Sequence, residues 1–268
     1  MTSRAELDAL SQRFDDLVPI EEPQSIRVAT TCHRDGYEMY GMRFVQGWQN
    51  WPEDAELYWY VEGFMPPPLP RTQLIPTTKV EGLESFKQRF AHYVPVAWNW
   101  DVVRFCNKVY AAVDAFSNFK GIGVWLDADC VTFKPISAEY IKSLIPKGHY
   151  MSMFKRTGMA TETGFWVMDC SHPEHEAFLA TWQSWYDTNE FRNLPEWHDC
   201  YTLDATVRMF EKRDLIKTHS LSGKFEKDMH PLCKVELGQY IDHCKGRRKI
   251  HGRSPENTNR TAIAPTAG

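Results

Sequence analysis

Runs of apolar, β-branched residues alternate with segments whose apolar residues recur at helical spacing, and this alternation constrains the fold more than any other feature. Strands are predicted at Ser25–Thr31, Leu57–Val61 and Gly123–Leu126. A helix is predicted from Asp101 to Ala115, with the aspartate as its N-cap. Strands that alternate with helices form a mostly parallel sheet covered on both faces. The sequence therefore predicts an α/β protein of Rossmann-like architecture.

Less regular sequence patterns predict the domain bounds and the remaining helices, strands and loops. The proline-rich stretch Met65–Pro76 is predicted to be a loop. We expect an N-terminal extension over residues 1–24, one catalytic domain over residues 25–254 and a disordered tail over residues 255–268, which is polar and small. The remaining predicted elements are helices at Glu6–Leu17, Tyr37–Trp48, Glu174–Tyr186 and Cys200–Phe210, and strands at Tyr150–Phe154 and Gly164–Met168.

Charge and cysteine content exclude several classes of protein. The formal net charge of -4 argues against binding polyanions by bulk charge, although Lys and Arg outnumber acids between Lys212 and Arg253. The N-terminal segment lacks the apolar stretch of a signal peptide, and no run reaches the length of a membrane helix, so a cytoplasmic protein without membrane insertion is expected. The 7 cysteines form no CxxC pair, which favours buried free thiols.

Two acids follow the predicted strand Gly123–Leu126 directly, as Asp127-Ala128-Asp129. Carboxylates this close repel each other, and burial disfavours their ionisation unless a cation compensates. Oxygen ligands suit Mg²⁺ or Mn²⁺, and such an ion neutralises charge that builds on a departing phosphate. A capped loop with one solvated acid is the alternative interpretation of so short a motif.

Haloacid-dehalogenase phosphatases also place a DxD after an apolar strand, with the first Asp as nucleophile. Their DxD normally lies near the start of the chain and is accompanied by a later pair of adjacent acids. Here the adjacent acid pairs, Asp15-Asp16, Glu21-Glu22 and Glu53-Asp54, all precede the DxD. The phosphatase is therefore the less favoured interpretation.

A second motif, H-x-x-G-x-x-K, stands near the C-terminus as His243, Gly246 and Lys249. A neutral imidazole is a suitable third protein ligand for a metal held by carboxylates, and it shifts the preference towards Mn²⁺. The glycine allows the backbone to approach a phosphate closely, and the lysine supplies a point charge. A solvated histidine in a basic loop is the alternative for this motif alone.

Together these motifs resemble the glycogenin-like and galactinol-synthase-like glycosyltransferases, a family of GT-A fold. The resemblance implies that Asp127, Asp129 and His243 coordinate Mn²⁺ and that Gly246 and Lys249 contact the UDP diphosphate. It also implies that the first strand, including Thr30 and Thr31, lies under the uracil. The chain departs from the family on the acceptor side, where it has Thr161-Glu162-Thr163-Gly164 and Trp197-His198-Asp199-Cys200.

The sequence also resembles a group of phage-associated glycosyltransferases, some of which are proposed to modify hydroxymethylated pyrimidines in DNA. The segments that carry this resemblance are Trp125–Asp129 (WLDAD), Glu196–Asp199 (EWHD) and Asp242–Ser254 (DHCKGRRKIHGRS). It implies a phage protein acting in the host cytoplasm on a DNA acceptor. Fold and donor site do not fix an acceptor, so other acceptors remain open.

Four further residues are candidates for the site. Arg104 and Lys108 share a face of the predicted helix and are expected to reach the diphosphate or the donor sugar. Glu162 and Asp199 are the acids best placed to face the reacting centre. Solvated or structural roles are the alternatives for each of them. Trp98 and Trp100 have faces suited to stacking on sugars or bases, or they pack in the interior.

The sequence predicts a metal-dependent glycosyltransferase that moves a hexose or pentose from a UDP-sugar to a hydroxyl acceptor, with retention favoured. The acceptor is modified DNA or, alternatively, a glycan or lipid-linked compound. A protein that binds a nucleotide sugar without turnover is the alternative from a different class.

Overall fold

The computed structural model describes residues 25–222 and 231–257. The predicted helix Glu6–Leu17 and the predicted extension over residues 1–24 lie outside the described residues, as do residues 258–268 of the predicted tail. At the start of that tail, Asn257 Nδ2 donates a hydrogen bond to the Gly238 carbonyl at 3.0 Å, and the Arg248 guanidinium pairs with the Glu256 carboxylate.

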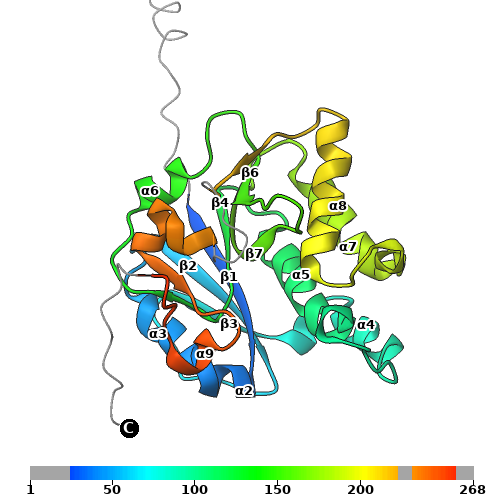
Figure 1. Ribbon diagram of the computed structural model, residues 1–268, viewed down its shortest axis with the longest axis horizontal. Helices are drawn as coiled ribbons and strands as arrows, with labels where there is room; N and C mark the ends of the chain where they lie inside the picture. The colour runs from blue at the N-terminus through cyan, green and yellow to red at the C-terminus, as the bar shows by residue number, and fades with distance from the viewer. Residues whose placement is uncertain (1–24, 223–230, 258–268) are drawn as a thin grey trace, which may run out of the picture.

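A seven-stranded sheet in the order β3-β2-β1-β4-β7-β6-β8 forms the centre of the molecule (Figure 1). Six strands run parallel, and β7 alone is antiparallel to its neighbours. The strands are β1 (Ile26–His33), β2 (Ala55–Glu62), β3 (Thr72–Pro76), β4 (Ile122–Leu126), β6 (Met151–Phe154), β7 (Glu162–Asp169) and β8 (Thr218–Ser220). The predicted α/β class with a mostly parallel sheet is confirmed.

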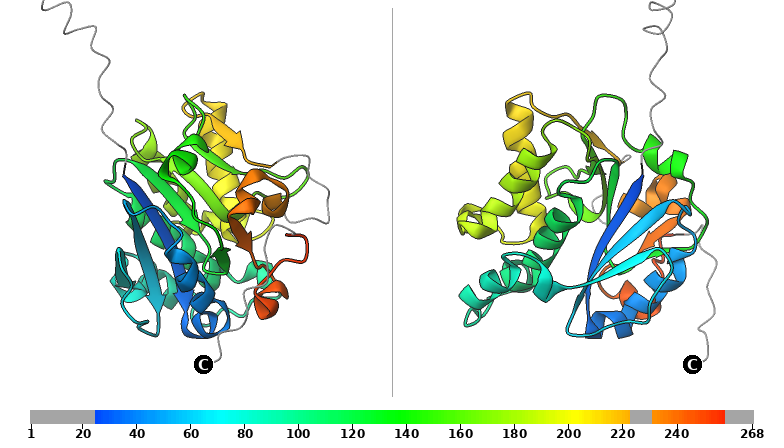
Figure 2. Two further views of the ribbon diagram at one scale, coloured as in Figure 1. Left: turned by 90° about the vertical axis from the view of Figure 1, so that its left-hand side faces the viewer. Right: turned by 180° about the vertical axis from the view of Figure 1, so that it is seen from behind.

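Helices cover both faces of this sheet (Figure 2). Alternate side chains of one strand enter different cores: Trp125 packs under the face covered by α4, α5, α7 and α8, whereas Val124 packs under the opposite face. The α-helices are α2 (Arg34–Gly36), α3 (Met42–Trp48), α4 (Leu83–Arg89), α5 (Val102–Phe116), α6 (Ala138–Ser143), α7 (His175–Asp187), α8 (Asp199–Lys212) and α9 (Arg248–His251).

Helix α5 begins where the sequence predicts. The Asp101 carboxylate accepts a hydrogen bond from the Arg104 backbone N–H at 3.2 Å, which satisfies one of the unpaired donors of the first turn. Its apolar residues face the sheet and α7, which leaves Arg104 exposed and Lys108 partly exposed on the other face. The cap and the apolar spacing therefore orient the two basic residues that the sequence singled out.

Two predicted elements differ from the structure. The stretch Met65–Pro76, predicted as a loop, ends in the strand β3, which pairs only with β2 at the sheet edge. An edge strand tolerates proline because its outer N–H groups need no partner, so proline content misled the prediction. The predicted helix Tyr37–Trp48 starts with a π-helix, η1 (Tyr37–Gly41), before α3.

A separate two-stranded ladder joins the middle of the chain to its C-terminal part. Strand β5 (Cys130–Thr132) pairs antiparallel with β9 (Ile241–His243), so that Cys130 lies opposite His243. The Cys244 N–H extends the ladder by donating to the Asp129 carbonyl at 3.0 Å. This ladder places the two sequence motifs side by side.

All 7 cysteines are buried and free, as predicted. None of the helices in the described parts of the chain combines the length and the apolar character that a bilayer span requires.

Candidate active site

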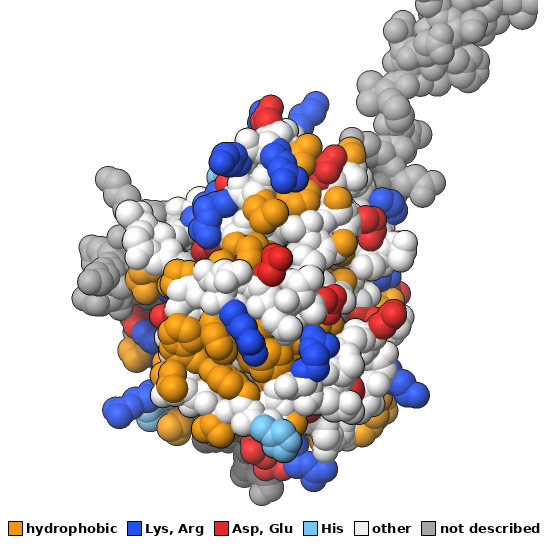
Figure 3. All heavy atoms as spheres, turned by 90° about the vertical axis from the view of Figure 1, so that its right-hand side faces the viewer, with side chains coloured by type: hydrophobic (Ala, Val, Ile, Leu, Met, Phe, Trp, Pro, Cys, Tyr) orange, Lys and Arg blue, Asp and Glu red, His pale blue; other side chains and the backbone are white. Residues whose placement is uncertain are grey.

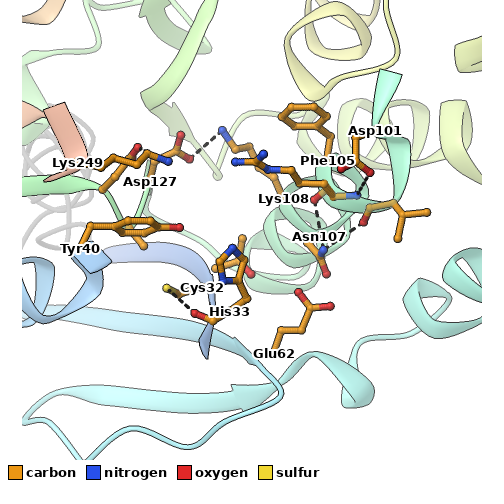
Figure 4. Close-up of a pocket in the computed structure, with 15 residues that line it drawn as sticks. Cys32, His33, Tyr40, Glu62, Asp101, Phe105, Asn107, Lys108, Asp127 and Lys249 are labelled. Atoms are coloured by element: carbon orange, nitrogen blue, oxygen red, sulfur yellow. Dashed lines mark hydrogen bonds and ion pairs between the residues drawn. The ribbon is translucent and has the colours of Figure 1, made fainter. Parts of the chain in front are cut away.

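Asp127 and Asp129 lie in the turn that follows β4, at the carboxyl end of the parallel strands. The Asp127 N–H donates to the Gly164 carbonyl at 2.9 Å. Trp125 is two residues earlier on the same side of the chain, and its Nε1–H donates to Asp127 Oδ1 at 2.7 Å. These two bonds orient the Asp127 carboxylate towards the cavity drawn in Figure 4.

The β5–β9 ladder brings the His243 imidazole to the two carboxylates. Its Nε2 lies 3.1 Å from Asp129 Oδ1 and 4.0 Å from Asp127 Oδ2. Two carboxylates and one imidazole that converge in this way form a donor set suited to Mn²⁺ or Mg²⁺. We name these three residues the carboxylate–imidazole cluster.

Cys130 lies beside this cluster, with its sulfur within 4.8 Å of ligand atoms of Asp129 and His243. Burial raises the pKa of the Cys130 thiol well above its ordinary value, and the negative charge of Asp129 adds to that effect.

The negative charge of the buried Asp129 carboxylate is balanced by two neighbouring side chains, His243 and Lys249. Burial alone would raise the pKa of this carboxyl, but His243 and Lys249 outweigh burial and hold the pKa well below its usual range. The Lys249 ammonium lies 3.0 Å from Asp129 Oδ2. Burial lowers the pKa of His243, and the negative charge of Asp129 more than reverses that effect. Asp129 is therefore ionised in the folded protein.

Lys108 connects the cluster to one predicted catalytic acid. Its ammonium lies 2.8 Å from Asp127 Oδ1 and 3.1 Å from Asp199 Oδ2. Burial would raise the pKa of Asp199, but Lys108 and a 2.5 Å hydrogen bond from the Thr163 hydroxyl keep that pKa below its usual range. Asp199 is thus an ionised carboxylate, at the start of α8.

Glu162, the other predicted acid, lies on the opposite side of His243. Its Oε1 is 3.8 Å from His243 Nδ1, and its Oε2 is 2.8 Å from the Lys245 ammonium and 3.6 Å from Arg156 Nη1. Glu162 and Asp199 are 3% and 2% exposed, so both lie beneath the surface of the site.

A cavity of about 470 Å³ opens between this cluster and α5 (Figure 4). Most of the predicted donor-binding residues line it: Thr31, Arg104, Lys108, Asp127, Asp129 and Lys249. Thr30 is fully buried, and Gly246 is exposed at a φ of +62° without being part of the lining.

Several residues of the site were missed from the sequence, and three of them show why. Tyr40 lines the cavity, and its ring lies 4.6 Å from the Lys249 ammonium. Asn107 also lines it, and its position three residues after Arg104 on a helix was an available signal. Gly164 contacts His243, and only the tertiary structure reveals that contact.

No protein-family model matches the sequence, and no curated protein matches it either. Among solved structures, the chain is similar to the glycosyltransferase GlyE of Streptococcus pneumoniae, with a TM-score of 0.44 and 11% identity over 72% of this chain and 44% of that one. It is also similar to mouse xyloside xylosyltransferase 1, with a TM-score of 0.43 and 8% identity over 74% of this chain and 85% of that one. A third similar structure is the galactosyltransferase LgtC in complex with donor and acceptor sugar analogues. Its TM-score is 0.45, with 8% identity over 66% of this chain and 69% of that one. The chain spans less than half the length of GlyE.

Proposed function

We propose that this chain is a metal-dependent glycosyltransferase of GT-A type that transfers a sugar from a UDP-sugar to a hydroxyl acceptor. The observation that carries the proposal is the convergence of Asp127, Asp129 and His243 beside Lys249 at one end of a cavity. These residues come from motifs far apart in the sequence, and each supplies a group that a metal-bound diphosphate requires.

The carboxylate–imidazole cluster fits a divalent cation by its chemistry. Asp127, Asp129 and His243 would hold Mn²⁺ or Mg²⁺, with the imidazole favouring Mn²⁺. Such an ion supplies Lewis-acid stabilisation of the negative charge on the departing diphosphate. The protein keeps Asp129 ionised and fixes Asp127 through Trp125, so both carboxylates are ready to bind a cation.

The basic side chains on the two sides of the cavity are suited to the diphosphate. Lys249 lies on one side and Lys108 lies on the other (Figure 4), and Arg104, which is on α5 with Lys108, also lines the cavity. Gly246 has the backbone freedom that a close phosphate approach needs, but it does not line the cavity. Thr31 and the buried Thr30, at the end of β1, are assigned to the nucleoside end of the cavity.

Asp199 and Glu162 are proposed to act on the reacting sugar. The bond between the anomeric carbon and the diphosphate oxygen breaks, and the acceptor oxygen bonds to that carbon. In the retaining mechanism, which we favour, the proton of the acceptor hydroxyl passes to the departing diphosphate. An ionised Asp199 supports this assignment because a carboxylate stabilises the positive charge that develops on the sugar.

The acceptor is a hydroxyl compound, and the two sources considered are hydroxymethylated pyrimidine in DNA and a glycan or lipid-linked hydroxyl. A DNA base would have to be flipped from its duplex to reach the donor. The alternative without turnover is a protein that only binds nucleotide sugars, which would have little need of all five residues Asp127, Asp129, His243, Gly246 and Lys249.

Two measurements test the proposal. With Mn²⁺ and a panel of UDP-sugars, the wild type is expected to release UDP slowly without an acceptor. No release from any of them would favour the protein that only binds. Calorimetric titration with UDP and Mn²⁺ is expected to give metal-dependent binding that Asp129→Ala abolishes. The exposed Asp54 supplies the matched control, Asp54→Ala, which should bind as the wild type does. Unchanged affinity in Asp129→Ala would refute the metal assignment.

A further inference from the structure

Four aromatic rings form a continuous surface beside the cavity. The Trp98 ring stacks on the His198 imidazole, with centroids 5.9 Å apart and planes 23° from parallel. Phe105 lies 5.4 Å from His198 and 6.2 Å from Trp98, and Tyr201 lies 5.0 Å from His198. We name Trp98, Phe105, His198 and Tyr201 the aromatic platform. Trp98 is 65% exposed and His198 is 6% exposed, so the Trp98 ring provides most of the apolar surface that the platform presents to solvent.

The neighbouring segment is apolar and exposed as well. Val94 and Val96 are 82% and 86% exposed, and Figure 3 shows hydrophobic side chains gathered on one face of the molecule. The segment is nevertheless anchored, because the Trp197 N–H donates to the Asn99 carbonyl at 3.1 Å and the Trp197 ring packs against Trp100. A contiguous exposed apolar surface held in place in this way is typical of a binding site.

The platform continues directly into the proposed active site. Phe105 lines the cavity together with Asp101, and His198 immediately precedes Asp199 in the sequence. Asp199 is in turn joined to Asp127 through Lys108. A molecule lying on the platform is therefore next to the end of the cavity where transfer would occur.

The charges at the platform distinguish between possible occupants. The Glu196 carboxylate lies 2.8 Å from His198 Nε2, Asp101 lines the cavity beside Phe105, and the Arg104 guanidinium lies 5.7 Å from the centre of the Phe105 ring. All three groups can hydrogen-bond sugar hydroxyl groups, and two acids with one base give the platform no excess of positive charge to hold the phosphates of a nucleic acid. Apolar ring faces suit the C–H face of a pyranose.

We propose that the aromatic platform is the acceptor subsite and that the acceptor is a neutral carbohydrate whose ring stacks on Trp98. This inference rests on the proposed function, because the platform matters only if a sugar is transferred beside it. Of the acceptors named above, this inference favours a glycan over hydroxymethylated pyrimidine in DNA and over a lipid-linked hydroxyl.

The test uses an array of neutral oligosaccharides with single-stranded DNA oligonucleotides printed beside them. In the presence of UDP and Mn²⁺, the wild type is expected to bind a subset of the oligosaccharides, and Trp98→Ala should bind them about tenfold more weakly. The control Ile250→Ala removes an equally exposed apolar side chain on α9 and should bind as the wild type does. Tyr201→Ala provides a second platform variant should Trp98→Ala fold poorly.

Three results would overturn the inference: no oligosaccharide bound, oligosaccharide binding unaffected by both platform variants, or DNA bound in a manner that depends on Trp98. Calorimetric binding of UDP and Mn²⁺ to the same variants separates this inference from the proposed function. Retained donor binding with lost oligosaccharide binding supports the acceptor subsite. Absence of donor binding in the wild type would refute the proposed function itself.

Discussion

Gly164 lies against the imidazole of His243 so closely that no other residue fits: a Cβ at Gly164 would be 2.1 Å from His243 Cε1. The same glycine accepts a hydrogen bond from the Asp127 N–H through its carbonyl. One residue of β7 thus contacts both motifs of the proposed metal site. The absence of a side chain at this position allows the imidazole to reach the carboxylates.

Gly164→Ala is expected to lower the unfolding free energy by about 1–3 kcal/mol, the usual cost of overpacking, and to weaken Mn²⁺ binding. Chemical denaturation and metal titration measure the two effects. In a His243→Ala background the imidazole is gone, so the same substitution should cost much less. An equal loss of unfolding free energy in both backgrounds would show that the contact with His243 is not the reason why residue 164 must be glycine.

His243→Ala is expected to weaken Mn²⁺ binding by about tenfold or more and Mg²⁺ binding much less, because Mn²⁺ benefits more from a nitrogen ligand. Calorimetry in the presence of UDP measures both affinities. The exposed His251 on α9 provides the control His251→Ala, which should match the wild type. Equal losses for the two ions would assign His243 a structural role.

Asp199→Asn should reduce turnover by about 10²–10⁴-fold while donor binding stays within about twofold of the wild type. Turnover falls because a neutral amide cannot stabilise the positive charge that develops on the sugar, and donor binding is retained because Asp199 does not line the cavity. Steady-state kinetics and UDP titration measure the two quantities. Asp214→Asn, at an exposed turn, controls for the amide substitution. A large loss of UDP affinity would instead indicate that Asp199 acts by positioning Lys108 for the diphosphate.

His175 should make the fold sensitive to acid. Its Nε2 bonds to the Phe116 carbonyl at 2.9 Å and its Nδ1 to the Tyr150 hydroxyl at 3.0 Å. Burial lowers the pKa of His175 below its ordinary value of 6.5, although the Phe116 carbonyl opposes that effect. The unfolded chain therefore takes up this proton more readily, and the stability contributed by neutral His175 is present above pH 6.5 and is lost as the pH falls towards the lowered pKa.

Urea denaturation at about pH 7.5 and 5.5 measures this effect. The wild type is expected to lose more stability between these conditions than His175→Gln, whose side chain does not titrate. The carboxyl groups contribute to both proteins alike, so the difference isolates His175. Identical losses would show that the His175 pKa is the same in the folded and unfolded chains.

The main elements of the fold could be predicted because their signals are local. Helix α5 has both a capping aspartate and apolar residues at helical spacing, and β4 is an uninterrupted apolar run before Asp127. Strand β3 was missed because the prolines that precede it, and Pro76 at its end, normally indicate a loop, whereas an edge strand accepts a terminal proline.

The candidate site was predictable in its residue types and less so in its contacts. The motifs identified Asp129, His243 and Lys249, and in the structure Asp129 lies 3.1 Å from His243 and 3.0 Å from Lys249. The ladder that unites them consists of three-residue strands, too short to show any periodicity. The link from Lys108 to Asp199 is a tertiary contact between two helices, for which a single sequence carries no signal.

The pairing of β5 with β9 also has a consequence for synthesis on the ribosome. Six of the seven strands of the central sheet, all but β8, are complete once β7 has emerged, whereas His243 follows more than seventy residues later. A nascent chain therefore holds Asp127 and Asp129 without their imidazole partner until nearly the whole domain has been translated. If the proposed metal binds, its binding is thus expected to follow the assembly of the central sheet.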